Sequence, residues 1–250
     1  MNLGGIPIGP FGGASWDHPM GLETVNGRDI FSRVLYGARI SLLIAILATA
    51  LSVFIGTVLG ITAGFFGGWV DAVLSRLMDM FLAFPLLVFA IALAGVFPDE
   101  AFGLSGLSLR LSLMVFIIGF FNWPYIGRIV RGQTISLRER EYVEAARSLG
   151  AKRHYILFTE LLPNLMAPII VNVALTIPTY IGYEAALSFL GVGVQPGTAS
   201  WGEMLSASLT WYATDPMYFV VPGVLLFITV LAFNLFGDSL QSALDPKKLR

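Results

Sequence analysis

Residues 40–70, ISLLIAILATALSVFIGTVLGITAGFFGGWV, contain no charged side chain, and this long apolar run indicates the class of fold. The hydrocarbon core of a bilayer is about 30 Å thick, so a helix that rises about 1.5 Å per residue needs about twenty apolar residues to cross it. Residues 40–70 exceed that length and predict a transmembrane helix. Gly56, Gly60 and Gly64 share one face of this helix, which favours the close approach of a second helix.

Four further windows without a charged residue follow along the chain, at residues 80–98, 111–127, 161–183 and 216–237. A single window of this kind could be a buried helix of a soluble protein, but five of them cannot. Pro85 is expected to kink the second span. Asn122, Trp123 and Pro124 suggest that the inner end of the third span is irregular or faces a cavity. The sequence thus predicts an all-α, polytopic membrane bundle of five transmembrane helices.

The composition agrees with a membrane protein and excludes several functions. Of the 250 residues, 56% are hydrophobic and 12% are charged, and the mean hydropathy is +0.78. The formal net charge of −1 provides no basic field for binding nucleic acid. The chain has no cysteine and two histidines, so thiol catalysis is excluded and no metal site is expected.

Basic residues collect on the cytoplasmic side of short loops and therefore predict the orientation. Residues 128–164 carry seven of them and the tail after the fifth window carries three, whereas the connection between the fourth and fifth windows carries none. If the first two segments lie inside, alternation places Arg76 inside as well, and eleven basic residues face the cytoplasm against four outside. We therefore expect an extracytoplasmic N-terminus and a cytoplasmic C-terminus.

Residues 1–39 precede the first window and are expected to form an extracytoplasmic arm followed by a short interfacial helix with snorkelling arginines, while residues 40–250 form the transmembrane domain. The alternative is that residues 30–39 are the first turns of the first span. The beginning of the chain has neither the basic nor the apolar segment of a signal peptide. Either the chain lacks an N-terminal helix, or its true start lies upstream, or insertion relies on the first span alone.

Residues 128–164 are the one long polar insertion. Ser136 and Glu139 have the spacing of a capping box, so a helix is expected to begin near Leu137. Gly150 stands where a glycine with positive φ would end this helix. The narrow apolar stripe of the helix consists of Tyr142, Ala145, Ala146 and Leu149.

A second short helix is expected after Gly150. Tyr155, Phe158 and Leu162 form its apolar stripe, and Pro163 is expected to end it. Two short helices at an angle would then project from the membrane. Alanines at the centre of the first stripe favour a closely packed partner.

At this point the sequence resembles a known family. The run EAARSLG at residues 144–150, followed by LLPN at residues 161–164, is similar to the EAA loop in the permease subunits of binding-protein-dependent ABC importers. Over about residues 29–246, six segments resemble, in order, the second permease subunit of dipeptide and oligopeptide importers. These segments are GRDIFSRVLYGARISL, FGGWVD, LREREYVEAARSLGA, EAALSFLGVGVQP, SWGEML and LAFNLFGDSLQSALDP.

The resemblance implies a type I importer permease that forms half of a pathway for di- or oligopeptides and is not itself an enzyme. It implies docking of residues 128–164 into a cytoplasmic ATPase, which binds the ATP and magnesium, so that this chain holds no cofactor. The implied partners are a homologous permease, two ATPase subunits and an extracytoplasmic binding protein, in a bacterial or archaeal plasma membrane. The implied coupling residues are Tyr142, Glu144, Ala145, Ala146, Gly150 and Pro163.

The chain departs from the family pattern in three places. Glu160 occupies a position where the family usually has isoleucine, although dipeptide-type members vary there. HPMGLETVNGRD, residues 18–29, differs in its middle from the HPLGTDxxGRD pattern. Family members usually have six spans, and the sixth would be an N-terminal helix absent here, in agreement with the orientation argument.

Polar side chains in or beside the apolar windows are candidates for lining the transport pathway, because lipid cannot satisfy them. For each of them a hydrogen bond between helices is the alternative. The candidates are Asn122, Asn172, Tyr180, Glu184 and Asn234.

Two other classes of protein fit the sequence less well. An ion- or proton-coupled secondary transporter would carry ionisable residues at mid-membrane, and the uncharged windows argue against it. An intramembrane Ser/His protease needs a base near its nucleophile, but His18 and His154 lie outside the windows, so no catalytic residue is expected. The chain also lacks the GxxxxGK[ST] motif, so it is not the ATPase.

Overall fold

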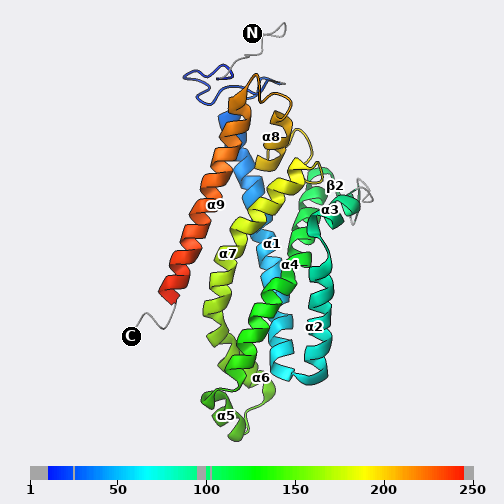
Figure 1. Ribbon diagram of the computed structural model, residues 1–250, viewed down its shortest axis with the longest axis vertical. Helices are drawn as coiled ribbons and strands as arrows, with labels where there is room; N and C mark the ends of the chain where they lie inside the picture. Colours follow the sequence, from blue (N-terminus) through cyan, green and yellow to red (C-terminus); the bar gives the residue numbers. More distant parts are fainter. Residues whose placement is uncertain (1–10, 25, 95–99, 102, 245–250) are drawn as a thin grey trace. The chain divides into compact units, whose positions relative to one another are not determined.

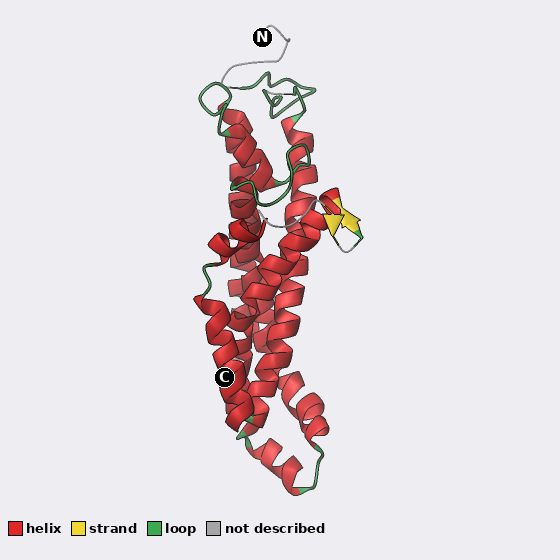
Figure 2. Ribbon diagram, turned by 90° about the vertical axis from the view of Figure 1, so that its right-hand side faces the viewer, coloured by secondary structure: helices red, strands yellow, loops and turns green. Residues whose placement is uncertain are grey.

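The computed structural model describes residues 11–24, 26–94, 100–101 and 103–244, and most of them are helical (Figures 1 and 2). The strands β1 (Glu100–Ala101) and β2 (Leu104–Ser105) form a short antiparallel pair. The helices are α1 (Ile30–Phe66), α2 (Gly68–Ala83), α3 (Leu86–Ala94), α4 (Gly106–Arg138), α5 (Glu141–Ser148), α6 (Arg153–Tyr155), the π-helix η1 (Ile156–Leu161), α7 (Leu162–Phe189), α8 (Trp201–Ser208) and α9 (Pro216–Leu244).

Four helical stretches are long and apolar enough to cross a membrane: α1, α4, the stretch from Arg153 to Phe189, and α9. The pair α2 and α3 supplies a fifth when it is counted as one broken span. The break lies at Pro85, and Phe84 before it is extended, with φ −80° and ψ 124°, because a following proline disfavours the α region. The all-α membrane fold is therefore confirmed, and the expected kink at Pro85 is a full interruption of the helix.

The first span begins earlier than the apolar window suggests. Asp29 Oδ2 accepts a hydrogen bond from Ser32 N–H at 2.7 Å, as an N-cap residue does, and α1 then runs unbroken to Phe66. Residues 30–39 are therefore the first turns of α1 and not a separate interfacial helix. A boundary at residue 39 would fall inside this helix.

Contacts divide the chain into two units, each of which has its own core. Unit 1 comprises Met1–Ile46, Leu87–Val115 and Pro178–Ala232, and unit 2 comprises Leu47–Leu86, Phe116–Ile177 and Phe233–Arg250. In unit 1 the buried side chains of Ile30, Val34, Met204 and Tyr218 pack together. In unit 2 one cluster contains Ile126, Val130, Leu165 and Ile169, and another contains Val143, Ile156 and Leu161.

Within unit 2, the glycine face of α1 packs directly against α4. A Cβ atom on Gly60 would lie 2.6 Å from the Gly127 carbonyl oxygen, and one on Gly64 would lie 2.8 Å from that of Arg131. These distances are too short for any side chain, so the two backbones approach as closely as glycine permits. The close helix approach predicted from the glycine spacing is confirmed.

The irregular inner end expected for the third span is not observed. α4 continues through Pro124, Trp123 is 2% exposed, and the aromatic ring of Phe81 contacts that of Trp123 with centroids 5.8 Å apart. Asn122 Nδ2 donates to the Ile118 carbonyl oxygen of the same helix at 2.7 Å. Burial of this turn among neighbouring side chains allows the helix to accommodate a proline within it.

Candidate coupling site

The helix α5 begins later than the capping-box spacing indicates. α4 extends to Arg138, so Ser136 lies inside a helix, and α5 starts after Arg140, which is extended with φ −81° and ψ 148° and provides no side-chain cap. The predicted start near Leu137 is therefore wrong. Leu137 packs against both apolar clusters of unit 2, and this burial keeps the last turn of α4 helical.

The C-terminal end of α5 agrees with the prediction from Gly150. Gly150 has φ +82°, its N–H donates to the Arg147 carbonyl oxygen, and the Ala151 N–H donates to the Ala146 carbonyl oxygen, both at 3.0 Å. This pair of bonds is the Schellman motif. The glycine thus sets the angle at which the chain leaves α5.

The second short helix does not stop at Pro163 as predicted. α6 passes into η1, and η1 passes into α7, so that the stretch from Arg153 to Phe189 is one candidate span. The π-turn geometry is visible where Leu162 N–H donates to the Leu157 carbonyl oxygen. Because Pro163 lies in the first turn of α7, its missing N–H is tolerated, and Asn164 Nδ2 donates to the Glu160 carbonyl oxygen at 2.7 Å.

The two faces of α5 differ in their surroundings. Val143 is fully buried and packs with Ile156 and Leu161, which attaches α5 to the rest of unit 2. The opposite face is open, with Tyr142 37% and Leu149 88% exposed. Figure 1 shows α5 and α6 beyond the C-terminal end of α4. The stripe predicted from the sequence is therefore a free surface of this chain.

That free surface borders a cleft of about 650 Å³ between α5 and the α6–η1 stretch. Four of the six predicted coupling residues line it, whereas Glu144 is exposed outside the cleft and Pro163 belongs to α7. The lining residues are Tyr142, Ala145, Ala146, Leu149, Gly150, Ala151, Lys152, His154, Tyr155 and Glu160. The cleft is mainly apolar, with small side chains on the α5 side.

Glu160 is the acidic residue of this cleft. Burial raises the pKa of the Tyr142 hydroxyl, and the Glu160 carboxylate raises it further, while Arg140 opposes the shift. The carboxylate and the tyrosine therefore act on each other across the cleft. The sequence gives no sign of this pairing, because residues 142 and 160 lie on different helices.

Three arginines on either side of α5 contact the end of α1 and the start of α2. Arg131 Nη2 donates to Asp71 Oδ2 at 2.7 Å, and Arg131 Nε contacts Asp71 Oδ1, which makes the pair bidentate. Arg138 Nη1 donates to the Gly64 carbonyl oxygen at 2.8 Å. The guanidinium of Arg153 lies 5.8 Å from the centre of the Phe66 ring. These contacts fasten both ends of the α5 region to the same turn.

The five candidate pathway residues are distributed over both units. Asn122 and Asn172 each donate to the carbonyl oxygen four residues earlier, Ile118 at 2.7 Å and Pro168 at 2.8 Å. Asn234 belongs to unit 2 and is exposed. Tyr180 and Glu184, in unit 1, are 3% and 0% exposed. A role in lining the pathway stays a prediction for all five.

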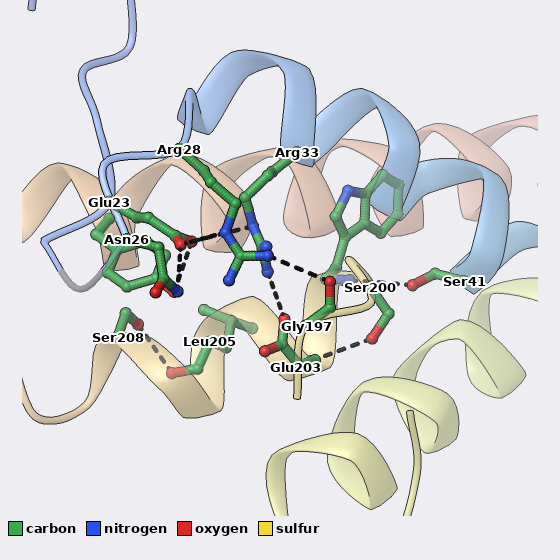
Figure 3. Close-up of polar contacts among 12 residues, drawn as sticks. Glu23, Asn26, Arg28, Arg33, Ser41, Gly197, Ser200, Glu203, Leu205 and Ser208 are labelled. Carbon is green, nitrogen blue, oxygen red and sulfur yellow. Dashed lines mark hydrogen bonds and ion pairs between the residues drawn. The ribbon is translucent and has the colours of Figure 1, made fainter. Parts of the chain in front are cut away.

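A second polar cluster, in unit 1, was not anticipated from the sequence (Figure 3). Glu23 Oε1 accepts from Arg28 Nε at 2.6 Å, and Glu23 Oε2 lies 3.2 Å from Arg33 Nε. Arg33 Nη2 donates to Glu203 Oε2 at 2.8 Å, and Arg33 is 7% exposed. Burial raises the pKa of the Glu203 carboxyl, and the Arg33 guanidinium opposes the shift. Arg33 is thus a buried ion-pair residue and not a snorkelling one.

The helix α8 is fixed in unit 1 by several contacts near this cluster. Ser200 Oγ accepts from Glu203 N–H at 3.1 Å, which caps the helix, and Ser41 Oγ accepts from Trp201 N–H at 3.2 Å. Trp201 Nε1 donates to the Val34 carbonyl oxygen at 3.1 Å. A Cβ atom on Gly202 would lie 2.6 Å from the Ala185 carbonyl oxygen. The segment between α7 and α9 therefore packs tightly on α1 and α7.

Comparisons with known proteins agree with this architecture. Over 235 residues the chain is 42% identical to the dipeptide transport system permease protein DppC of Alkalihalophilus pseudofirmus, covering 94% of this chain and 74% of the relative. It is 39% identical, with the same coverage, to the glutathione transport system permease protein GsiD of Pectobacterium atrosepticum.

Among solved structures, an inward-facing form of the MetNI methionine ABC transporter shares the fold with a TM-score of 0.67 at 19% identity, over 86% of this chain and 98% of that one. The family model for the binding-protein-dependent transport system inner membrane component matches residues 56–250. The chain therefore belongs to this family, the non-catalytic, multi-pass permease subunits of ABC importers.

Proposed function

We propose that this permease imports short peptides and that residues 128–164 couple it to a cytoplasmic ATPase. The observation that carries the coupling assignment is the open face of α5, where Tyr142, Ala145, Ala146 and Gly150 border a mainly apolar cleft. Small side chains at its centre allow a partner element to approach closely. Val143, buried on the opposite face, transmits any movement of α5 to the rest of unit 2.

The proposed substrate class follows from the relatives. One is named for dipeptide transport and the other for glutathione transport, and glutathione is itself a peptide of three residues. Di- and oligopeptides are therefore the substrates proposed for this chain. Selectivity among them would reside in an extracytoplasmic binding protein that delivers the peptide.

The complete transporter would contain further subunits beside this chain. A homologous permease supplies the other half of the pathway, and two ATPase subunits bind ATP and magnesium. The C-terminus and residues 128–164 lie in the cytoplasm, and the N-terminus lies outside, as the distribution of basic residues indicates. Family membership decides against the secondary transporter and the intramembrane enzyme.

The coupling assignment is tested by cross-linking. The chain has no cysteine, so Ala146→Cys introduces a single thiol on the open face of α5. With the permease pair and its ATPase in proteoliposomes, this thiol is expected to cross-link to the ATPase, whereas Ser148→Cys, an exposed residue outside the cleft, serves as the matched control. Absence of any cross-link from position 146, in particles that still import peptide, would contradict the assignment.

Orientation has a separate test. Reporter fusions after Gly13 and Gly150 are expected to report an extracytoplasmic and a cytoplasmic position, respectively. A cytoplasmic signal at Gly13 would reverse the proposed topology.

A further inference from the structure

The cleft beside α5 contains a carboxylate, that of Glu160, which forms no ion pair with any other described residue. Glu160 projects from η1 and borders the cleft together with Ala145, Ala146 and Tyr155. Lys152 and His154 border the same cleft, yet within the described part of the chain no basic nitrogen lies within 4.0 Å of the Glu160 carboxylate. The carboxylate raises the pKa of the nearby Tyr142 hydroxyl, but this tyrosine carries no positive charge that could pair with it.

A partner that covers the cleft would change the solvation of the Glu160 carboxylate. In the free chain, water reaches Glu160, which is partly exposed. A partner that fills a largely apolar cleft removes this water, and an ionised carboxylate without a counter-charge is then strongly destabilised. A stable complex therefore requires a cation next to Glu160. Isoleucine, the usual residue at this position in the family that the chain resembles, would impose no such requirement.

We infer that the ATPase subunit presents a basic side chain, arginine or lysine, that pairs with Glu160 when α5 docks. This inference rests on the proposed role of residues 128–164 in binding the ATPase, and it adds the chemistry that makes the contact selective. An ATPase that offers an apolar side chain at this point would leave Glu160 buried and unpaired. Glu160 is thus a determinant of which ATPase this permease accepts.

The test measures binding of the ATPase to the assembled permease pair in nanodiscs. Glu160→Gln keeps the size of the side chain and removes the charge, and Glu160→Lys reverses it. We expect the first change to weaken binding about thirtyfold or more and the second by a larger factor, since the first leaves a buried cation without its partner and the second places two cations side by side. The matched control is Glu141→Gln, an exposed glutamate in the first turn of α5 that does not border the cleft, and it should bind as the unaltered chain does.

A genetic selection identifies the basic residue of the ATPase that pairs with Glu160. Variants of the ATPase selected to restore uptake by Glu160→Lys should replace one basic residue by an acidic one. The same ATPase variant should bind the unaltered permease poorly, because two carboxylates would then face each other. This reciprocal exchange would establish the pair.

Several outcomes would overturn the inference. If Glu160→Gln and Glu160→Lys bind the ATPase normally while Ala146→Trp does not, the docking site stands and the ion pair is wrong. If Ala146→Trp also binds normally, the proposed coupling function fails with it. If Lys152→Ala alone reproduces the loss caused by Glu160→Gln, the counter-charge lies within this chain and not on the ATPase.

Discussion

Arg33 and Glu203, 170 residues apart in the chain, form a buried ion pair with 2.8 Å between Nη2 and Oε2. Arg33 lies in the first turn of α1 and Glu203 in the first turn of α8, and Glu23 completes the cluster from the segment before α1. The Arg33 guanidinium therefore pairs with two carboxylates that are almost fully buried, and Arg28 also pairs with Glu23. The cluster joins three segments of unit 1 that the sequence separates widely.

Replacing Arg33 by methionine should destabilise unit 1 by about 3 to 5 kcal/mol, because it leaves the buried Glu203 without its ion-pair partner and leaves Glu23 paired with Arg28 alone. Arg39→Met, an exposed arginine on the same helix, is the control and should have little effect. Thermal unfolding of the purified chain in detergent measures the difference. Adding Glu203→Gln to Arg33→Met should recover part of the loss. Equal stability of the Arg33→Met and Arg39→Met variants would refute the pairing.

Gly60→Ala should disrupt the α1–α4 contact, because the new methyl group would lie 2.6 Å from the Gly127 carbonyl oxygen. A cost of about 1 to 3 kcal/mol is expected, as for other overpacked interiors. Gly132→Ala is the control, since no atom lies within 4 Å of the Cβ position at this glycine of α4. The melting temperature should fall for the first variant only; identical melting of both would show that the helices do not approach so closely.

Asp71→Asn should loosen the α1–α2 turn from α4, because Arg131 loses its bidentate carboxylate partner. The pair is only partly buried, so we expect a loss of about 1 kcal/mol, the upper end for ion pairs near the surface. Reversing both charges, in Asp71→Arg with Arg131→Asp, should restore stability relative to either single reversal. Hydrogen exchange of the turn reports the effect, and a double variant as unstable as the singles would argue against a direct pair.

Gly150→Val should strain the end of α5, because valine is disfavoured at φ +82° by about 1 to 3 kcal/mol. The Cβ position itself is open, with no atom within 4 Å, so the cost is one of backbone conformation and not of crowding. Gly150→Asn is the matched control, since asparagine tolerates this region. Membrane insertion should persist in both, while peptide uptake and ATPase binding fall only in the valine variant. Equal uptake by the two variants would show that the angle set by Gly150 is unimportant.

Much of the fold can be predicted from the sequence, because a segment that crosses a bilayer must be long, apolar and helical. Uncharged stretches long enough to cross the hydrocarbon core, such as residues 40–70, must form helices whose backbone bonds are satisfied internally. The end of α5 at Gly150 can be predicted in the same way, since it depends only on the ability of glycine to adopt a positive φ. The open stripe of α5 followed from helical spacing alone, because its residues lie within two turns of one another.

Helix boundaries were predicted less well where distant packing competes with local signals. Ser136 and Glu139 have the spacing of a cap, yet burial of Leu137 against two clusters extends α4 past them. Pro163 is a local stop signal, but a π-turn before it and the Asn164 side chain allow the helix to continue.

Local patterns in the sequence are enough to show that this chain crosses a membrane several times, where its polar loop lies and which residues form the apolar stripe of α5. Only the packing of distant segments pairs Arg33 with Glu203 and Arg131 with Asp71, and places Glu160 in one cleft with Tyr142. The physical reason is the range of the interactions. Hydrophobic length and helical periodicity act within a few turns of one segment, whereas the choice of an ion-pair partner depends on which helices pack together, and no local pattern encodes it.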